Sequence, residues 1–521
     1  MTRNRKLLTA ATAALAVAAI AITTTAYAQD TDPTQNPIVD TNSGPVRGTD
    51  SGTVRTYQGI PYAAPPTGDL RWQPPKKAEP WTQPLDATKS GKPCVQPTDQ
   101  PIAIPGGEED CLTLNVTSPT KGDNKKPVIV WIHGGSFTYG DGASYGAEKL
   151  ATRGDAVVVT INYRLGAFGF LSHPDLKNAD NLGLRDQQAA LKWVRANASA
   201  FGGDNRNVTI MGESGGGYSI CGHLAAPKSA GLFDKAIIHS AGCVGSADAS
   251  MTREQAEKNG EDFAERLDCT DVACMRAKDS ETILTAAESG HEGYRPFHGT
   301  KTLPLSPSEA IESGRINEVP VLHGSNHDEE NGRLAGEELA TGTPLTEDDY
   351  RKRMRETFGD DAEAVMAEYP VSDYASPSNA LGAAQTDANW STHSYDTQKA
   401  LAKHVPVYAF DIAEPNAPWF NGMPRPSFTI GTGHMQELAY FYDNALFEKR
   451  DGDQERLSDA LIDYWSRFVH SSDMNERGLP KWKQFKHHRP YTQKLVADLD
   501  AIGRTDYATE HHYDFWKSLN R

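Results

Sequence analysis

Apolar residues, many of them valine and isoleucine, cluster without regular alternation with polar residues in several short segments along the chain. These segments are residues 127–135, 156–164, 207–212, 235–242, 319–326 and 405–412. A strand with one buried face alternates apolar and polar residues, whereas these runs of valine and isoleucine leave no polar face. They therefore predict the strands of a mostly parallel sheet that is covered on both faces.

Helix-like periodicity separates these runs. Apolar side chains fall on one face of a helix in residues 183–196. A second helix is expected after Thr346, where Asp349 gives a loose capping box and apolar residues recur every four positions. Residues 37–125 are richer in proline and glycine and indicate small irregular strands. Strands that alternate with helices predict an α/β fold, in which ligands bind beyond the carboxyl ends of the strands.

The first 28 residues have the pattern of a targeting segment. A positively charged start precedes an apolar run from Leu7 to Ile22, and Ala26-Tyr27-Ala28 has the small residues that signal peptidase requires. We therefore expect a signal peptide at 1–28 and a secreted mature chain, 29–521; an uncleaved N-terminal anchor is the alternative. No later segment has the roughly 20 apolar residues of a membrane-spanning helix, so we expect no stable membrane anchor.

Composition narrows the classes of function. Hydrophobic residues make up 38% of the chain and charged residues 23%, as in ordinary soluble proteins. The formal net charge is −17, which argues against nucleic-acid binding because that function needs a basic surface. The sequence has no metal-ligand spacing and no nucleotide-binding loop, so it predicts neither a metal nor a cofactor.

Six cysteines in a chain expected to be secreted indicate three disulfides. Cys94 with Cys111, and Cys269 with Cys274, are close enough in sequence to close local loops. Cys221 and Cys243 are the remaining two cysteines. They either form a third bridge or are buried free thiols.

Two serines lie in a Gly-x-Ser-x-Gly pentapeptide. Ser214 follows the apolar run 207–212 and precedes a segment of small and apolar residues, which gives the strand, sharp turn and helix of a nucleophile elbow. Ser144 follows a polar, glycine-rich stretch and has no strand before it. We therefore predict Ser214 as a nucleophile and Ser144 as a chance match.

A serine nucleophile needs a base, and an acid usually orients that base. The histidines considered are 393, 404, 434, 470, 487, 488, 511 and 512. His434 is favoured because it lies on a glycine-flanked loop before an apolar stretch, whereas the pairs His487-His488 and His511-His512 have polar surroundings and are expected at the surface. The acid candidates are Asp328, Glu329 and Glu330, which follow the apolar run 319–326.

The order of longer motifs resembles that of the type-B carboxylesterases, a group of α/β-hydrolases that includes the cholinesterases. The motifs include YQGIPYAAPPTGDLRWQPP, EDCLTLNV, PVIVWIHGGSFTYG, NYRLGAFGFL, FGGDNRNVTIMGESGGG, LHGSNHDEE and GTGHMQELAYF. The resemblance covers residues 37–515 and implies a single α/β-hydrolase domain with helical insertions over the active site. It implies a carboxylic ester hydrolase that works through an acyl-enzyme on small-molecule esters.

The resemblance also assigns residues. It makes Ser214 the nucleophile, His434 the general base and acid, and Glu329 the acid of the triad. This chain has Glu330 where the family usually has glycine, so Glu330 is an alternative to Glu329. The disulfides 94–111 and 269–274 match those of the family.

The resemblance further places an oxyanion hole at the backbone N–H groups of Gly135, Ser136 and Gly215. Ser136 replaces a glycine or alanine, which bears on the tolerance for bulky alcohols. Cys221 and Cys243 fall where they can be neighbours, so a third bridge is predicted.

The sequence gives less about the substrate. Residues 95–110 contain no aromatic residue that could hold a quaternary ammonium, so choline esters are not the expected substrate. Residues 335–400 are expected to form helices over the mouth of the site. A lipase or an amidase or carbamate hydrolase could use the same triad, and a non-catalytic binding protein is the alternative from another class.

Overall fold

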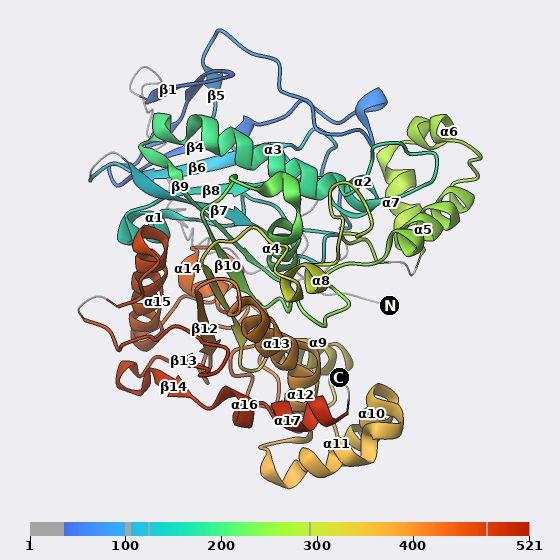
Figure 1. Ribbon diagram of the computed structural model, residues 1–521, viewed down its shortest axis with the longest axis vertical. Coiled ribbons are helices and arrows are strands. Elements are labelled where there is room, and N and C mark those ends of the chain that lie inside the picture. Colours follow the sequence, from blue (N-terminus) through green and yellow to red (C-terminus); the bar gives the residue numbers. More distant parts are fainter. Residues whose placement is uncertain (1–35, 99–105, 123–124, 291–292, 476–477, 520–521) are drawn as a thin grey trace, which may run out of the picture. The chain divides into compact units, whose positions relative to one another are not determined.

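The predicted apolar runs form the middle of a large sheet in the computed structural model (Figure 1). The structure describes residues 36–98, 106–122, 125–290, 293–475 and 478–519, and the predicted signal peptide lies outside them. Residues 37–521 belong to one compact unit. None of the helices in the described ranges combines the length and the apolar character needed to span a bilayer.

The sheet has eleven strands within the described residues, in the order β14-β13-β12-β11-β10-β9-β7-β8-β6-β4-β3. They are β3 (Thr49–Asp50), β4 (Val54–Pro61), β6 (Thr113–Pro119), β7 (Lys126–Ile132), β8 (Val157–Ile161), β9 (Gly203–Glu213), β10 (Lys235–His239), β11 (Val321–Asn326), β12 (Val407–Ile412), β13 (Thr492–Leu495) and β14 (Gly503–Thr505). The strands from β8 to β13 are parallel, and antiparallel strands lie at both edges. The predicted α/β fold is therefore confirmed. A smaller sheet contains β1 (Ile38–Thr41), β2 (Gly44–Arg47) and β5 (Leu85–Asp86).

Strand β7 shows why these runs do not alternate apolar and polar residues. Val128, Val130 and Ile132 pack into an apolar cluster on one face of the sheet. Ile129 and Trp131, which alternate with them, pack into a different cluster on the other face. Because both faces are covered, every position of the strand is buried, and the predicted double burial is confirmed.

Helices on the two faces provide these clusters. α3 (Leu182–Asn197) and α4 (Gly215–Ala225) pack against one face, and α1 (Glu148–Gly154) and α15 (Gly452–Ser471) against the other. The other helices of the core region are α2 (Gly166–Phe170), α5 (Arg253–Arg266), α6 (Val272–Ala277), α7 (Ser280–Glu288), α8 (Pro307–Glu312), α14 (Leu438–Phe441), α16 (Tyr507–Glu510) and α17 (Tyr513–Ser518).

Residues 331–401 form the helices expected in this part of the chain. They are α9 (Asn331–Thr341), α10 (Glu347–Phe358), α11 (Ala362–Glu368), α12 (Pro377–Thr386), a short π-helix (Asp387–Ser391) and α13 (Thr392–Leu401). The predicted capping box at Thr346 and Asp349 is present, with both reciprocal hydrogen bonds. Most of these helices share an apolar cluster of their own, which also includes Trp516 of α17.

All six cysteines are bridged. The pairs are Cys94–Cys111, Cys221–Cys243 and Cys269–Cys274, and the structure contains no free cysteine in its described residues. The second bridge ties α4, which begins directly after Ser214, to the segment that follows β10.

Candidate active site

Ser214 lies on a sharp turn between β9 and α4. Its backbone has φ 54° and ψ −122°, a conformation that L-residues rarely adopt. The glycines around it allow the turn, because a Cβ on Gly216 would lie 1.9 Å from the carbonyl oxygen of Ile132, and one on Gly212 would lie 2.7 Å from Gly216. The turn therefore has the geometry expected for a nucleophile elbow.

The hydroxyl of Ser214 meets an imidazole that comes from a distant loop. Nε2 of His434 lies 3.0 Å from Oγ of Ser214, and Nδ1 of His434 lies 2.7 Å from Oε2 of Glu329. Glu329 is buried, and its other carboxylate oxygen accepts the backbone N–H of Asn326 at 2.9 Å. The N–H of His434 also donates to the carbonyl of Glu329 at 3.0 Å. The three predicted residues are thus brought together in one hydrogen-bonded chain.

The other acid and serine candidates have different partners. Asp328 accepts the backbone N–H of Thr432, and Glu330 pairs with Arg333. Ser144 is exposed and lies in a loop. Only Glu329, of the three consecutive acids that the structure describes, contacts His434.

One histidine prediction is wrong. His511, expected at the surface, is only 3% exposed. Its Nδ1 lies 2.5 Å from Oδ1 of Asp387, a carboxylate far away in sequence. The neighbouring His512 is half-buried and contacts Glu368, whereas His487 and His488 are exposed as expected. The polar sequence around His511 gave no sign of this remote partner, which is why the local pattern failed.

The loop after β7 approaches the turn that carries Ser214. Gly135 and Ser136 both have positive φ, at 98° and 52°, and a Cβ added to Gly215 would lie 3.2 Å from the nitrogen of Ser136. Within the described residues, the backbone N–H groups of Gly135, Ser136 and Gly215 have no hydrogen-bond acceptor. Three unpaired donors therefore lie on the two backbone segments that meet at Ser214.

Sequence reasoning missed Glu213, although it is the second residue of the pentapeptide. Its carboxylate is buried and lies 3.2 Å from Nε2 of His434. Burial raises the pKa of Glu213, because the charged carboxylate is poorly solvated there. Burial lowers the pKa of His434, but the nearby Glu213 and Glu329 more than offset this, and the net shift is upward. The two groups titrate as a pair, because a proton on Glu213 removes a charge that favours the imidazolium.

Sequence reasoning also missed Trp390. The indole packs on the imidazole of His434, with ring centroids 4.6 Å apart. Its Nε1 donates to Oε1 of Glu330 at 2.9 Å. Glu330, the residue that departs from the resembled pattern, thus holds the ring that covers one side of His434. No local sequence signal links Trp390 to this loop.

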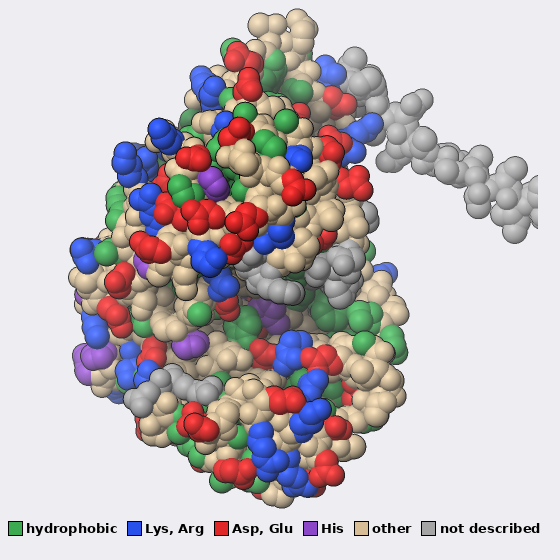
Figure 2. All heavy atoms as spheres, turned by 90° about the vertical axis from the view of Figure 1, so that its right-hand side faces the viewer, with side chains coloured by type: hydrophobic (Ala, Val, Ile, Leu, Met, Phe, Trp, Pro, Cys, Tyr) green, Lys and Arg blue, Asp and Glu red, His purple; other side chains and the backbone are tan. Residues whose placement is uncertain are grey.

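A cavity of about 660 Å³ opens onto Ser214 and His434. It is lined by Gly135, Ser136 and Glu213, by residues of the segment 139–146, and by residues of the segment 443–446. One face of the protein is visibly hollowed near its middle, with histidine and hydrophobic side chains inside the hollow (Figure 2).

The two wall segments of the cavity are joined by backbone. Gly146 and Asp443 exchange both of their N–H···O bonds, at 3.1 and 2.8 Å. Tyr139, Tyr145, Leu438 and Leu446 give the lining an aromatic and apolar part.

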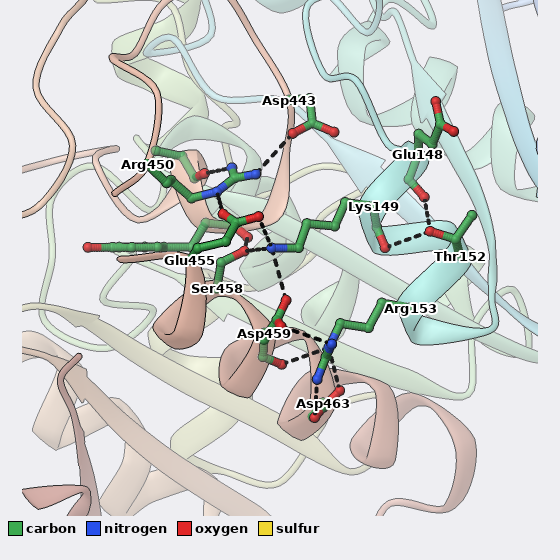
Figure 3. Close-up of polar contacts among 12 residues, drawn as sticks. Glu148, Lys149, Thr152, Arg153, Asp443, Arg450, Glu455, Ser458, Asp459 and Asp463 are labelled. Atoms are coloured by element: carbon green, nitrogen blue, oxygen red, sulfur yellow. Dashed lines mark hydrogen bonds and ion pairs between the residues drawn. The ribbon is translucent and has the colours of Figure 1, made fainter. Parts of the chain in front are cut away.

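Ion pairs hold the elements behind this wall (Figure 3). Lys149 of α1 contacts Glu455 at 2.8 Å and Asp459 at 3.0 Å, both on α15. Arg450 contacts Asp443 at 3.1 Å and also pairs with Glu455. Arg153 of α1 extends the network along α15 to Asp463 (Figure 3). The network therefore links α1, which follows the wall segment 139–146, to Asp443 in the wall segment 443–446.

Comparison with known proteins places the chain among esterases. The sequence profile of the carboxylesterase family matches residues 35–516. Para-nitrobenzyl esterase from Bacillus subtilis (strain 168) is 43% identical over 311 residues, which cover 56% of this chain and 63% of that protein, less than two thirds of it. Cocaine esterase from Oryctolagus cuniculus is 32% identical over 533 residues, which cover 92% of this chain and 95% of that protein. The solved structure of a thermophilic pNB esterase superposes with a TM-score of 0.76 at 31% identity, over 92% of this chain and 99% of that one.

Proposed function

Since this chain belongs to the carboxylesterase family and is a carboxylic ester hydrolase, we propose that Ser214 is the nucleophile of its reaction. The observation that carries the proposal is the chain of hydrogen bonds from Ser214 through His434 to Glu329. A serine alone is a weak nucleophile, and a base within hydrogen-bond reach that is itself oriented by a carboxylate supplies the activation.

The reaction follows from these contacts. As Oγ of Ser214 attacks the ester carbonyl carbon, Nε2 of His434 takes the hydroxyl proton, and Glu329 stabilises the resulting imidazolium through Nδ1. His434 then protonates the alcohol oxygen as the C–O bond breaks, which leaves an acyl-enzyme. Water attacks the acyl carbon in the same way and releases the carboxylate.

When Ser214 attacks the ester, negative charge develops on the carbonyl oxygen. Hydrogen-bond donors that are already in position stabilise this charge. The N–H groups of Gly135, Ser136 and Gly215 have no competing acceptor in the described residues, which supports their role as the oxyanion hole. Each such donor contributes roughly 3 to 4 kcal/mol to stabilising the transition state. Because only the backbone N–H is used, Ser136 can serve in place of a glycine or alanine.

The lining of the cavity favours small esters that carry an aromatic or apolar group. A cavity of about 660 Å³ is large enough for a small organic molecule, and Tyr139, Tyr145 and Leu446 offer it apolar contact. Similar proteins bear the names para-nitrobenzyl esterase and cocaine esterase, which supports aromatic esters as the substrate class.

We also propose that the enzyme is secreted after cleavage near Ala28. The support is the targeting pattern of residues 1–28 together with three disulfides, since disulfides persist in oxidising compartments outside the cytosol. Sequencing the N-terminus of protein from the culture medium tests this, with Gln29 as the expected first residue.

The nucleophile is tested with a series of p-nitrophenyl esters from acetate to palmitate. Ser214→Ala is expected to lower kcat roughly 10⁴-fold or more, because the residual rate then depends on binding and the oxyanion hole alone. Ser144→Ala is the matched control, since it removes a serine hydroxyl at the rim of the same cavity. Full activity of Ser214→Ala, or an equal loss of activity in both variants, would contradict Ser214 as the nucleophile.

A further inference from the structure

A second cluster of histidine and carboxylate side chains lies behind the loop that carries Glu329. We propose that His327, Asp411 and His511 form a binding site for a divalent transition-metal ion of the Zn²⁺ type. One ligand atom from each of the three lies within 4.8 Å of the others. Two imidazoles and a carboxylate are ordinary zinc ligands.

The three residues come from separate parts of the fold. His327 directly follows β11, Asp411 lies in the neighbouring strand β12, and His511 directly follows α16. Nδ1 of His327 lies 3.0 Å from Oδ2 of Asp411, and Nε2 of His511 lies 3.8 Å from the same oxygen. A carboxylate flanked by two ring nitrogens is therefore already assembled, and a small contraction would place all three around one ion.

Two atoms of the cluster have no hydrogen-bond partner within the described residues. They are Nε2 of His511 and Oδ1 of Asp411, and both are buried. His511 is 3% exposed and Asp411 is 0% exposed, so neither atom reaches bulk water. A buried polar atom without a partner costs free energy, and such exceptions call for an explanation. A cation between the two rings would use Nε2 of His511 together with Oδ2 of Asp411, the oxygen that both ring nitrogens face.

Hydrogen bonds with residues remote in sequence fix the orientation of the His511 ring. Its Nδ1 is held by Asp387, whose second oxygen accepts the hydroxyl of Tyr369 at 2.8 Å. The hydroxyl of Tyr369 accepts Nε1–H of Trp516 at 2.7 Å. A carboxylate on the far nitrogen is the usual partner of a metal-binding histidine, because it leaves the other nitrogen free to bind.

An ion can reach the cluster from solvent. The side chain of His327 is 31% exposed and lines a cavity of about 770 Å³. The carboxylates that line this cavity are Asp328, Glu414, Asp451, Asp453 and Asp498, against the single cation Lys494. An acidic cavity concentrates cations, and its water can supply the fourth ligand of a tetrahedral site.

Metal at this position would tie three segments together beside the triad acid. His327 is two residues from Glu329, and Asp328 is hydrogen-bonded to Thr432, two residues before His434. The expected effect of the ion is therefore to stabilise the loops that carry the acid and the base rather than to contact substrate.

The test is calorimetric titration of ZnCl₂ into untagged protein that has been stripped with EDTA. One ion per chain is expected. His327→Ala removes an accessible ligand and is expected to abolish that binding, and Asp387→Asn is expected to weaken it about 10- to 100-fold through loss of the outer partner of His511. His488→Ala, which removes an exposed histidine, is the control and is expected to bind as the wild type does.

Three results of the zinc titration would contradict the site. The first is a wild-type protein that binds no zinc, which would mean that the cluster is a buried network of protonated histidines and carboxylates. The second is His327→Ala that binds zinc as well as the wild type, and the third is an equal loss of binding in His488→Ala. Co²⁺ titration of the wild type gives a reading that does not depend on any variant folding: an intense visible absorption of four-coordinate Co²⁺ is expected, and the weak spectrum of hydrated Co²⁺ contradicts the proposal.

Discussion

We predict that the carboxylate of Glu213 sets the pH at which His434, the proposed base, becomes active, and Glu213→Gln tests this. Glutamine keeps the shape of the side chain but removes its charge. His434 must be unprotonated to accept the proton of Ser214, and an ionised Glu213 favours the protonated imidazole. Removing that charge lowers the pKa of His434, so the acidic limb of the kcat/KM profile is expected to move to lower pH.

The size of the shift follows from the distance. Two unit charges 3.2 Å apart interact by about 5 kcal/mol at an effective dielectric constant of about 20, equivalent to roughly 4 pKa units. This is an upper bound, because burial raises the pKa of Glu213 and leaves it neutral over part of the range. A shift of about 1 to 3 pH units is therefore expected, in keeping with charges at such distances.

The measurement is kcat/KM for one p-nitrophenyl ester between pH 4 and pH 9 in a buffer of constant ionic strength (chosen as about 0.1 M, where the Debye length is ~10 Å). Asp443→Asn is the matched control, because it removes a carboxylate from the same cavity whose partner is Arg450. Its acidic limb is expected to coincide with that of the wild type. An unmoved limb in Glu213→Gln, or a move to higher pH, would refute the electrostatic reasoning.

Three further predictions concern neighbours of the site. Glu329→Gln is expected to lower kcat roughly 10⁴-fold, whereas Glu330→Gln stays within about tenfold because its amide oxygen still accepts from Trp390; steady-state kinetics of both variants decides which acid orients the base. Trp390→Ala is expected to lower kcat/KM about tenfold through loss of the ring packed on the imidazole, and Trp390→Phe to restore most of it. Replacing Cys221 and Cys243 together by alanine is expected to lower the free energy of unfolding by about 3 kcal/mol, measured by urea denaturation; an unchanged urea midpoint contradicts a stabilising bridge.

The parts of the site that the sequence predicted are those with a local signature. The glycines around Ser214 and the strand before it specify a sharp turn, and the run 319–326 specifies a strand whose end carries the acid. Doubly buried strands leave an unbroken apolar pattern, so the sheet was also predictable. The pattern could not separate Glu329 from Glu330 without the resemblance, because the direction of consecutive side chains in a turn depends on packing around them.

The parts that were missed depend on contacts between remote segments. Trp390 and His511 owe their positions to Glu330 and Asp387, which lie far from them in sequence. Glu213 is different, since it lies beside Ser214 in the pentapeptide. Its apolar flanking strand could have marked it as a buried charge, the kind of group whose pKa is shifted at functional sites.

The wall of the cavity at Ser214 has a consequence for biosynthesis. Lys149 and Glu455, which join α1 to α15, are 306 residues apart in sequence. A nascent chain that already contains Ser214 and the loop of Gly135 still lacks His434 and the second wall segment. Contacts of such long separation form only after a large loop has closed, which slows folding. If His434 is the base, as proposed, a chain that ends before residue 434 is expected to lack esterase activity even where its other site residues are already in place.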